Sequence, residues 1–264
     1  MRGQKAVFLL SRNCYNKHMI INIIALFLLG LICGSFINSL IYRLFYNISL
    51  WKRSICPICK VKLKAKDLIP LLSYLILQAK CRYCQKKISI YYFLVELTTG
   101  TLFVLAYLHY QAITLFLVRD LFFILVLIFI MFFDLKYYLV LDKIIWGSLA
   151  IAFVVNILLG VVWWNLLIGL LIGGMFFLLQ YLLTNGKAVG FGDVNLGMLI
   201  GVMLGWQLTI LTLFIAYIIG GIIAIIFVLS KKKKMKDILP MGTFLAIGAI
   251  IALLIGENIL RLIF

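Results

Sequence analysis

Two aspartates, Asp134 and Asp193, are the residues of this sequence best suited to chemistry. The chain holds only eight acidic residues among 264, and a carboxylate at membrane depth is costly enough to indicate a functional site. Asp134 follows the apolar run LFFILVLIFIMFF, and Asp193 ends the motif GFGD at residues 190–193. Two carboxylates held close together cannot both ionise readily, so one keeps its proton. Such a pair can hydrolyse a peptide, because one carboxylate takes a proton from water while the other carboxyl donates to the scissile carbonyl.

The glycines of the GFGD motif make Gly190 and Gly192 candidates for lining a substrate cleft. Glycine lets the backbone leave helical geometry beside Asp193, and irregular backbone at membrane depth is tolerated where it lines a cavity. The alternative is that Asp134 and Asp193 are only carboxylates at helix ends, with Asp193 as an N-cap. Asp142 is a third candidate, which an N-cap or interface role explains more simply.

Four cysteines form two CxxC pairs separated by 21 residues, and they predict a zinc site. Each CxxC turn directs two thiolates at one ion, and two turns complete a tetrahedral Zn–S4 centre. Nearby Lys and Arg side chains favour the thiolates, and a small loop without its own core needs such a metal to fold. Four cysteines close the coordination shell, so we expect a structural Zn²⁺. The ligands would be Cys56, Cys59, Cys81 and Cys84.

Two other uses of these cysteines are open, a redox dithiol and a pair of disulfides. A reducing cytosol argues against disulfides, and two matched pairs suit a ligand set better than one redox couple. Cys14 and Cys33 have no partners and are expected to be small apolar fillers or free thiols.

Small and polar residues also mark the first apolar segment, where Gly34 and Asn38 are one helical turn apart. Close helix packing through small residues accounts for this pattern. The alternative is a polar lining for a substrate groove, with Asn38 as one of its residues. Glu96 opens the second apolar segment and is expected to pair with a cytoplasmic base.

The composition predicts an all-α integral membrane protein. The chain is 66% hydrophobic and 12% charged, whereas soluble domains are about 45–50% apolar and about 25% charged. Apolar runs of membrane-spanning length predict about eight transmembrane helices. They lie near 19–41, 91–111, 113–133, 144–162, 165–183, 193–206, 208–229 and 239–262. A third helix running from Leu121 to Leu141 is an equal alternative, because Arg119 and Asp120 interrupt the apolar pattern there.

The Lys and Arg residues indicate the orientation of these helices. Of the 25 in the chain, eleven lie in the 42–90 loop, and eight more lie in the three other connections on the same face. That face should be cytoplasmic, which explains the net charge of +17 without nucleic acid as a partner. Four basic residues in the 1–18 tail conflict with this orientation, and translation from Met19 would remove the conflict. The Lys231–Lys234 run is expected to anchor the chain at acidic membrane lipid.

We therefore divide the chain into four parts. A short N-terminal tail covers 1–18, the first transmembrane helix 19–41, a zinc-ribbon-like cytoplasmic domain 42–90, and the transmembrane protease core 91–264.

Several motifs, in order along the chain, resemble those of the type IV prepilin peptidases. They are Gly34–Asn38 with Ile41–Arg43; Arg53-Ser54 before Cys56-Pro57; Ile69–Tyr74; Cys81-Arg82 with Ile88-Ser89 and Glu96-Leu97; Asp134-Leu135 with Asp142; Gly190–Val194; and Leu239–Leu245. The resemblance covers almost all of the chain after residue 30, and the combination is far more specific than any single motif.

The resemblance implies that Asp134 and Asp193 are the catalytic pair. It also implies that the substrates are prepilins or pseudopilins, cut between a short basic leader and a hydrophobic helix at the inner face of a bacterial membrane. Many members of the family then N-methylate the new terminus with S-adenosylmethionine, and in members that have it the tetracysteine loop is associated with zinc. No nucleotide-binding motif for a methyl donor is visible here.

The chain departs from the family pattern in three places. Leu141 replaces a proline before Asp142, Asn195 replaces a lysine two residues after the GFGD aspartate, and the stretch 240–243 reads PMGT where PFGP-like sequences are usual. None removes the aspartate pair, but they leave substrate preference and methyl transfer open. The rival hypothesis is a transporter that uses the same carboxylates for ions or protons, with a regulatory zinc loop; further intramembrane charges or paired broken helices would be expected there.

Overall fold

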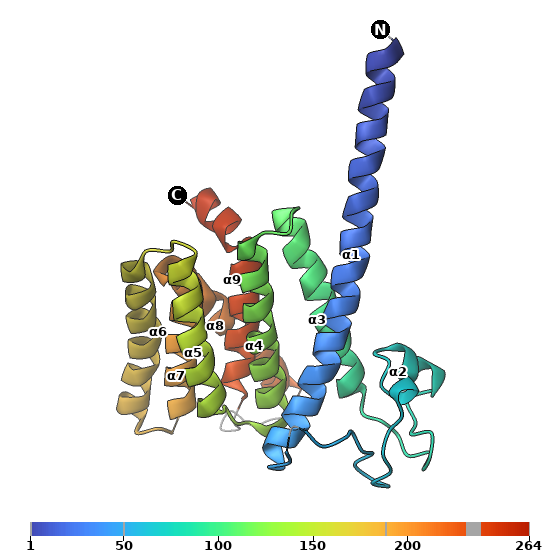
Figure 1. The fold of residues 1–264 in the computed structure, drawn as a ribbon. Coiled ribbons are helices and arrows are strands. Elements are labelled where there is room, and N and C mark those ends of the chain that lie inside the picture. The colour runs from blue at the N-terminus through green and yellow to red at the C-terminus, as the bar shows by residue number, and fades with distance from the viewer. Residues whose placement is uncertain (1, 50, 188, 231–238, 264) are drawn as a thin grey trace. The chain divides into compact units, whose positions relative to one another are not determined.

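The computed structural model describes residues 2–49, 51–187, 189–230 and 239–263, and side chains from His18 to Leu262 within those ranges. All regular elements there are helices, apart from two isolated β-bridges. Eight long helices match the eight predicted segments one for one (Figure 1). They are α1 (Arg2–Phe45), α3 (Ile90–Tyr110), α4 (Leu115–Tyr137), α5 (Asp142–Leu158), α6 (Trp163–Thr184), α7 (Phe191–Leu204), α8 (Trp206–Leu229) and α9 (Met241–Ile263).

Six of these helices are long and apolar enough to cross a membrane, which confirms a multi-pass membrane protein. The span within α1 is His18–Phe45, and the helix extends back to Arg2 through the expected tail. α4 begins at Leu115, so Arg119 and Asp120 lie inside a helix rather than before one. The Lys231–Lys234 anchor lies outside the described residues.

The two remaining helices, α5 and α7, are shorter, with 17 and 14 residues. At 1.5 Å per residue, α7 is about 21 Å long, against about 30 Å of hydrocarbon in a typical bilayer. α7 stops at Gly205, whose φ of +78° turns the chain into α8. Glycine adopts this backbone geometry without a steric penalty.

The chain forms two compact units, residues 1–117 and 118–264. In the first unit α1 packs along α3, with the tetracysteine loop between them in sequence. Small residues allow this contact, because a Cβ on Gly30 would lie 2.7 Å from Gly100 Cα and one on Gly34 would lie 2.8 Å from Glu96 Cα. Two short helices stand in the loop, η1 (Ala65–Asp67) and α2 (Leu72–Ile76).

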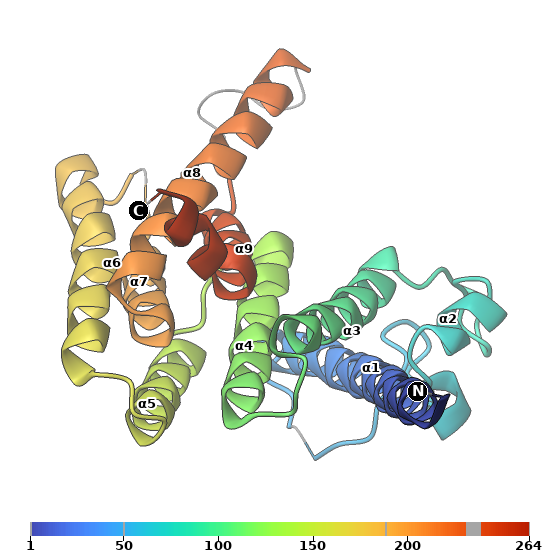
Figure 2. The ribbon, with the colours of Figure 1, turned by 90° about the horizontal axis from the view of Figure 1, so that it is seen from above.

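The second unit is built around the close packing of α6 and α7, which lie side by side in Figures 1 and 2. Gly169 meets Gly201, and Gly173 meets Gly197, so closely that a Cβ on any of the four would overlap the opposing backbone. α7 also packs on α5, and α8 on α9. Small residues therefore let the α6 and α7 backbones touch, as is common between membrane helices.

We expect Gly197→Ala to loosen this pair. The added methyl would collide with Gly173 and Phe177, and overpacking of this kind costs about 1–3 kcal/mol or more. Thermal unfolding of the purified protein in detergent should show a clearly lower midpoint.

Gly221→Ala is the matched control, because an added Cβ there meets nothing within 4 Å. Its melting temperature should equal or exceed that of the parent. Equal melting temperatures for both variants would contradict the direct contact between α6 and α7.

Candidate active site

Asp134 lies near the end of α4, is 4% exposed, and binds the start of α9. Its Oδ2 accepts a hydrogen bond from the Thr243 N–H at 2.7 Å and one from the Thr243 hydroxyl at 3.1 Å. Thr243 is the third residue of α9, so the carboxylate meets an N–H that has no partner within the helix. A negative charge at a helix N-terminus is also favoured by the helix dipole.

The neighbouring glycine gives the carboxylate its space. A Cβ on Gly242 would lie 3.1 Å from Asp134 Oδ2 and 3.4 Å from Val140 Cγ2. The sequence showed the stretch PMGT only as a family motif and gave Thr243 no role. The sequence signal for this contact would have been a small residue followed by a hydroxyl residue, Gly242 and Thr243, at the start of a helix. A backbone N–H and a hydroxyl at that position can bind an aspartate such as Asp134.

Asp193 lies in the first turn of α7, where Gly190 is the N-cap and Asp193 is the third helical residue. The Gly190 N–H donates to Asp193 Oδ2 at 3.1 Å. The suggestion that Asp193 is itself the N-cap is therefore wrong. Gly190 has room for a Cβ, whereas a Cβ on Gly192 would lie 3.1 Å from Val140 Cβ. Of the two proposed cleft glycines, only Gly192 is closely packed against another residue.

Val140 links the two aspartates, because it contacts both Gly192 beside Asp193 and Gly242 beside Asp134. The starts of α7 and α9 and the end of α4 therefore meet at one end of the second unit (Figure 1). Two carboxylates that are far apart in the sequence are thus neighbours.

A second polar pair joins the same end of α7 to α5. Asn195, 3% exposed, donates through Nδ2 to Asp142 Oδ1 at 2.9 Å, while its own Oδ1 has no hydrogen-bond partner among the described residues. Asp142 is the first residue of α5 and follows the N-cap Leu141. Its carboxylate therefore lies in the first helical turn, rather than at the N-cap position.

The remaining cleft candidate, Asn38, lies in the first unit, on α1. Its Nδ2 donates to the Tyr92 carbonyl at 2.9 Å and so ties α1 to α3. The prediction that Glu96 pairs with a basic residue is wrong. The 8% exposed carboxylate instead accepts the Leu71 N–H at 2.8 Å, which attaches the loop to α3.

The four cysteines of the two CxxC pairs lie together. Their sulfur atoms are all within 4.8 Å of one another, and Cys56 and Cys81 are buried. Four sulfur atoms bound at about 2.3 Å to one tetrahedral zinc ion would also lie within 4.8 Å of one another. The donor set therefore fits Zn²⁺. Cys33 is outside the cluster, and the side chain of Cys14 is outside the described residues.

Both cysteine turns have the same backbone structure. The Lys60 N–H donates to the Cys56 carbonyl and the Gln85 N–H to the Cys81 carbonyl, at 3.0 and 2.9 Å. Lys60 and Gln85 share a positive φ, at 58° and 56°. A single antiparallel bridge closes each turn, Ile55 with Lys62 and Lys80 with Lys87. The two turns are thus equivalent halves of one metal-binding unit.

Asp67 connects η1 to the second cysteine turn. Its carboxylate accepts hydrogen bonds from Arg82 Nε at 2.7 Å, the Lys64 N–H at 3.1 Å and the Tyr83 hydroxyl at 3.2 Å. Burial alone would raise the pKa of Asp67, but the hydrogen bonds from Arg82, Lys64 and Tyr83 outweigh it and hold this pKa below its ordinary value. The ionised carboxylate thus braces the turn that carries Cys81 and Cys84.

Comparisons with known proteins agree with this architecture. The model of the bacterial peptidase A24 N-terminal domain matches residues 28–110, and that of the type IV leader peptidase family matches residues 121–225. No solved structure is significantly similar.

Several curated relatives carry the name prepilin leader peptidase/N-methyltransferase. The protein from Legionella pneumophila is 34% identical over 214 residues, covering 79% of this chain and 74% of its own length. The Bacillus subtilis protein is 33% identical and covers 89% and 95%. That from Aeromonas salmonicida is 33% identical and covers 89% and 91%. With both family models matched in order and relatives of this similarity aligned over most of its length, the chain belongs to the type IV leader peptidase family.

Proposed function

We propose that this protein is a membrane aspartyl endopeptidase that cleaves the leader of type IV prepilins or pseudopilins. The observation that carries the proposal is the placement of Asp134 and Asp193 at one end of the second unit, where Val140 packs against the glycine beside each of them. Family membership supplies the substrate class, since the relatives named above are prepilin leader peptidases.

In the proposed mechanism the two carboxyl groups share the work of hydrolysis. Thr243 holds one oxygen of Asp134 through two hydrogen bonds, and the Gly190 N–H holds one oxygen of Asp193. These bonds fix the orientation of both carboxyl groups. One carboxylate takes a proton from the attacking water, and the other carboxyl donates a proton to the scissile carbonyl oxygen.

The proposed substrate has a basic leader followed by an apolar helix. The apolar helix would lie in the membrane beside the bundle, with the leader at the cytoplasmic face that the Lys and Arg distribution indicates. Asp134, Asp142 and Asp193 form no ion pair within the described part of the chain. The proposed location of this site is the bacterial inner membrane.

We also propose that the tetracysteine cluster holds a structural Zn²⁺. With four thiolate ligands the coordination shell is closed, so the ion would stabilise the loop and take no part in hydrolysis. The 42–90 loop would then be a separate metal domain, and 91–264 the protease core. α3 packs with α1 in the compact unit that ends at residue 117.

N-methylation of the new terminus with S-adenosylmethionine is a second proposed activity, since the relatives' names include N-methyltransferase. Incubating the purified protein with a prepilin and S-adenosylmethionine should give a cleaved product that is heavier by one methyl group in mass spectra. A product of unmodified mass would limit this chain to proteolysis, and an uncut, unmodified substrate would favour the rival transporter.

Asp134→Asn and Asp193→Asn should each abolish leader cleavage. An amide can neither accept the proton from water nor donate one as an acid, and loss of one acid–base group typically costs about 10²–10⁴-fold. The assay is cleavage of a purified prepilin in detergent, followed by mass spectrometry.

Glu257→Gln is the matched control, because it makes the same carboxylate-to-amide change on an exposed side chain at the far end of α9. It should retain normal activity. Normal cleavage by either aspartate variant would contradict the pair.

Cys81→Ser should remove the metal and loosen the loop. Loss of one of four thiolates opens the coordination shell, and the binding free energy of a structural zinc is folding free energy. Elemental analysis should give one zinc per parent chain and little in the variant, whose loop should be cut faster by a protease.

Cys33→Ser provides the comparison, since Cys33 lies on α1 outside the cluster. Its zinc content should equal that of the parent. A parent chain purified under gentle conditions without any metal would refute the zinc proposal.

A further inference from the structure

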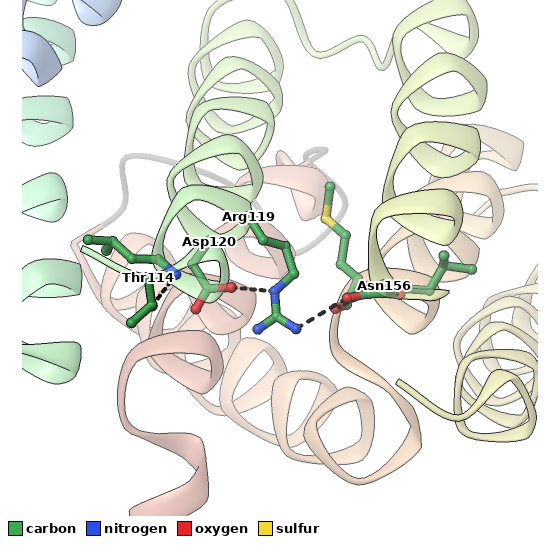
Figure 3. A network of polar contacts seen from close by, with 7 residues as sticks. Thr114, Arg119, Asp120 and Asn156 are labelled. Carbon is green, nitrogen blue, oxygen red and sulfur yellow. Dashed lines mark hydrogen bonds and ion pairs between the residues drawn. The ribbon is translucent and has the colours of Figure 1, made fainter. Parts of the chain in front are cut away.

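Three polar residues, one half-buried and two buried, form a chain of contacts at the end of the second unit opposite the aspartates. They are Arg119 and Asp120 near the start of α4, and Asn156 near the end of α5 (Figure 3). Asp120 is 2% exposed and Asn156 is 1% exposed. Buried charges in a membrane helix are costly and therefore indicate a function. These three residues belong neither to the metal loop nor to the aspartate pair.

The contacts run from α4 through α5 to α7. Arg119 Nε donates to Asp120 Oδ1 at 2.8 Å, and Arg119 Nη1 donates to Asn156 Oδ1 at 3.2 Å (Figure 3). Asn156 Nδ2 in turn donates to the carbonyls of Val202 and Met203, at 2.8 and 3.3 Å. Asp120 neutralises the guanidinium, and Arg119 fixes the amide so that its donor side faces α7.

α7 needs such a donor because it ends inside the bundle. The last carbonyls of a helix have no partner within it, and water has little access to Val202 and Met203, which are 1% and 3% exposed. Val202 and Met203 lie in the last turn of α7, directly before the break at Gly205. Asn156 therefore binds the C-terminal end of the helix whose N-terminal end carries Asp193.

The same network also fixes α4, the helix that carries the other aspartate. Arg119 is near the start of α4 and Asp134 near its end, about 22 Å apart along the helix at 1.5 Å per residue. The two helices that carry the aspartates are thus joined at both ends. At one end the aspartates, Val140 and Gly192 meet, and at the other end Asn156 bridges Arg119 to Met203.

We propose that Arg119, Asp120 and Asn156 are positioning residues that hold α7 at a set depth beside α4 and so set the spacing of Asp134 and Asp193. Along α6, α7 packs through close glycine backbone contacts, with Phe177 against Gly197 and Met198 against Gly174. The hydrogen bonds of Asn156 to two successive carbonyls define one register. The inference rests on the proposed function in one respect, namely that the spacing of the two aspartates serves hydrolysis.

The first test is kinetic and uses Asn156→Leu, which removes the donor and acceptor at similar volume. Leader cleavage should show a kcat that falls about 10–100-fold, because a displacement of about 1 Å at a reacting group can cost this much. KM should change less than kcat, since α7 remains packed on α6. The pH dependence of kcat should also change, because it depends on the spacing of the two carboxyl groups.

Two companion variants separate positioning from a general loss of stability. Asn165→Leu removes a similar bond, from the Trp206 N–H at the start of α8, and should leave kcat and its pH profile unchanged. Replacing Arg119 and Asp120 together by leucine leaves no unpaired charge and should resemble Asn156→Leu. Combining the double replacement with Asn156→Leu should add little, since residues of one network are not additive.

The second test needs no activity. Spin labels attached through a ketone-bearing unnatural amino acid at Leu135 and Phe191, both exposed, report the distance between the ends of α4 and α7 at the aspartates. The native cysteines remain untouched. We expect one narrow distance distribution in the otherwise unchanged chain and in Asn165→Leu, and a shifted or broader one in Asn156→Leu.

An unchanged distance in Asn156→Leu would overturn the positioning role, whatever the activity. A changed distance in a protein that never cleaves a prepilin would leave the positioning role in place and refute the proposed function instead.

Discussion

A helix that begins or ends within a membrane leaves backbone N–H and carbonyl groups that only the protein itself can satisfy. In this chain polar side chains bind the backbone at several helix ends. Asp134 accepts from the start of α9, Asp193 from the N-cap of α7, and Asn156 donates to the last turn of α7. In the first unit Glu96 accepts the Leu71 N–H. The requirement to satisfy helix ends thus places both aspartates of the proposed active site, and it does so from helices that are far apart in the sequence.

The need for partners at helix ends applies especially to α7, because this helix is short. α7 has 14 residues between Gly190 and Gly205, fewer than a membrane-spanning helix needs, and its last turn is buried in the bundle. Its glycines let it lie directly on α6, and its two ends are held by polar contacts with other helices. The result is a short element whose position is defined at both ends, which is suitable for carrying one half of a catalytic pair.

Much of the fold could be predicted from the sequence, because each segment shows its type locally. Apolar runs predicted the eight helices, and CxxC spacing predicted the cysteine cluster, since both patterns act over short distances. The partners of the polar residues could not be predicted. Thr243 and Asn156 are single residues within apolar runs, and which carbonyl or carboxylate they meet depends on how distant helices pack. For the same reason the predicted basic partner of Glu96 was wrong, because the structure has the N–H of Leu71 there, and the alternative of Asp193 as an N-cap was wrong, because Gly190 takes that place.

The central claim is that Asp134 and Asp193 act as one unit in which one carboxyl is protonated and the other ionised. The pH dependence of kcat for leader cleavage, measured across the range in which the protein stays folded, tests this most directly. The account predicts a bell-shaped curve, because activity is lost when both groups are protonated and again when both are ionised. A curve that rises to a plateau with a single titration, and stays there at high pH, would contradict it.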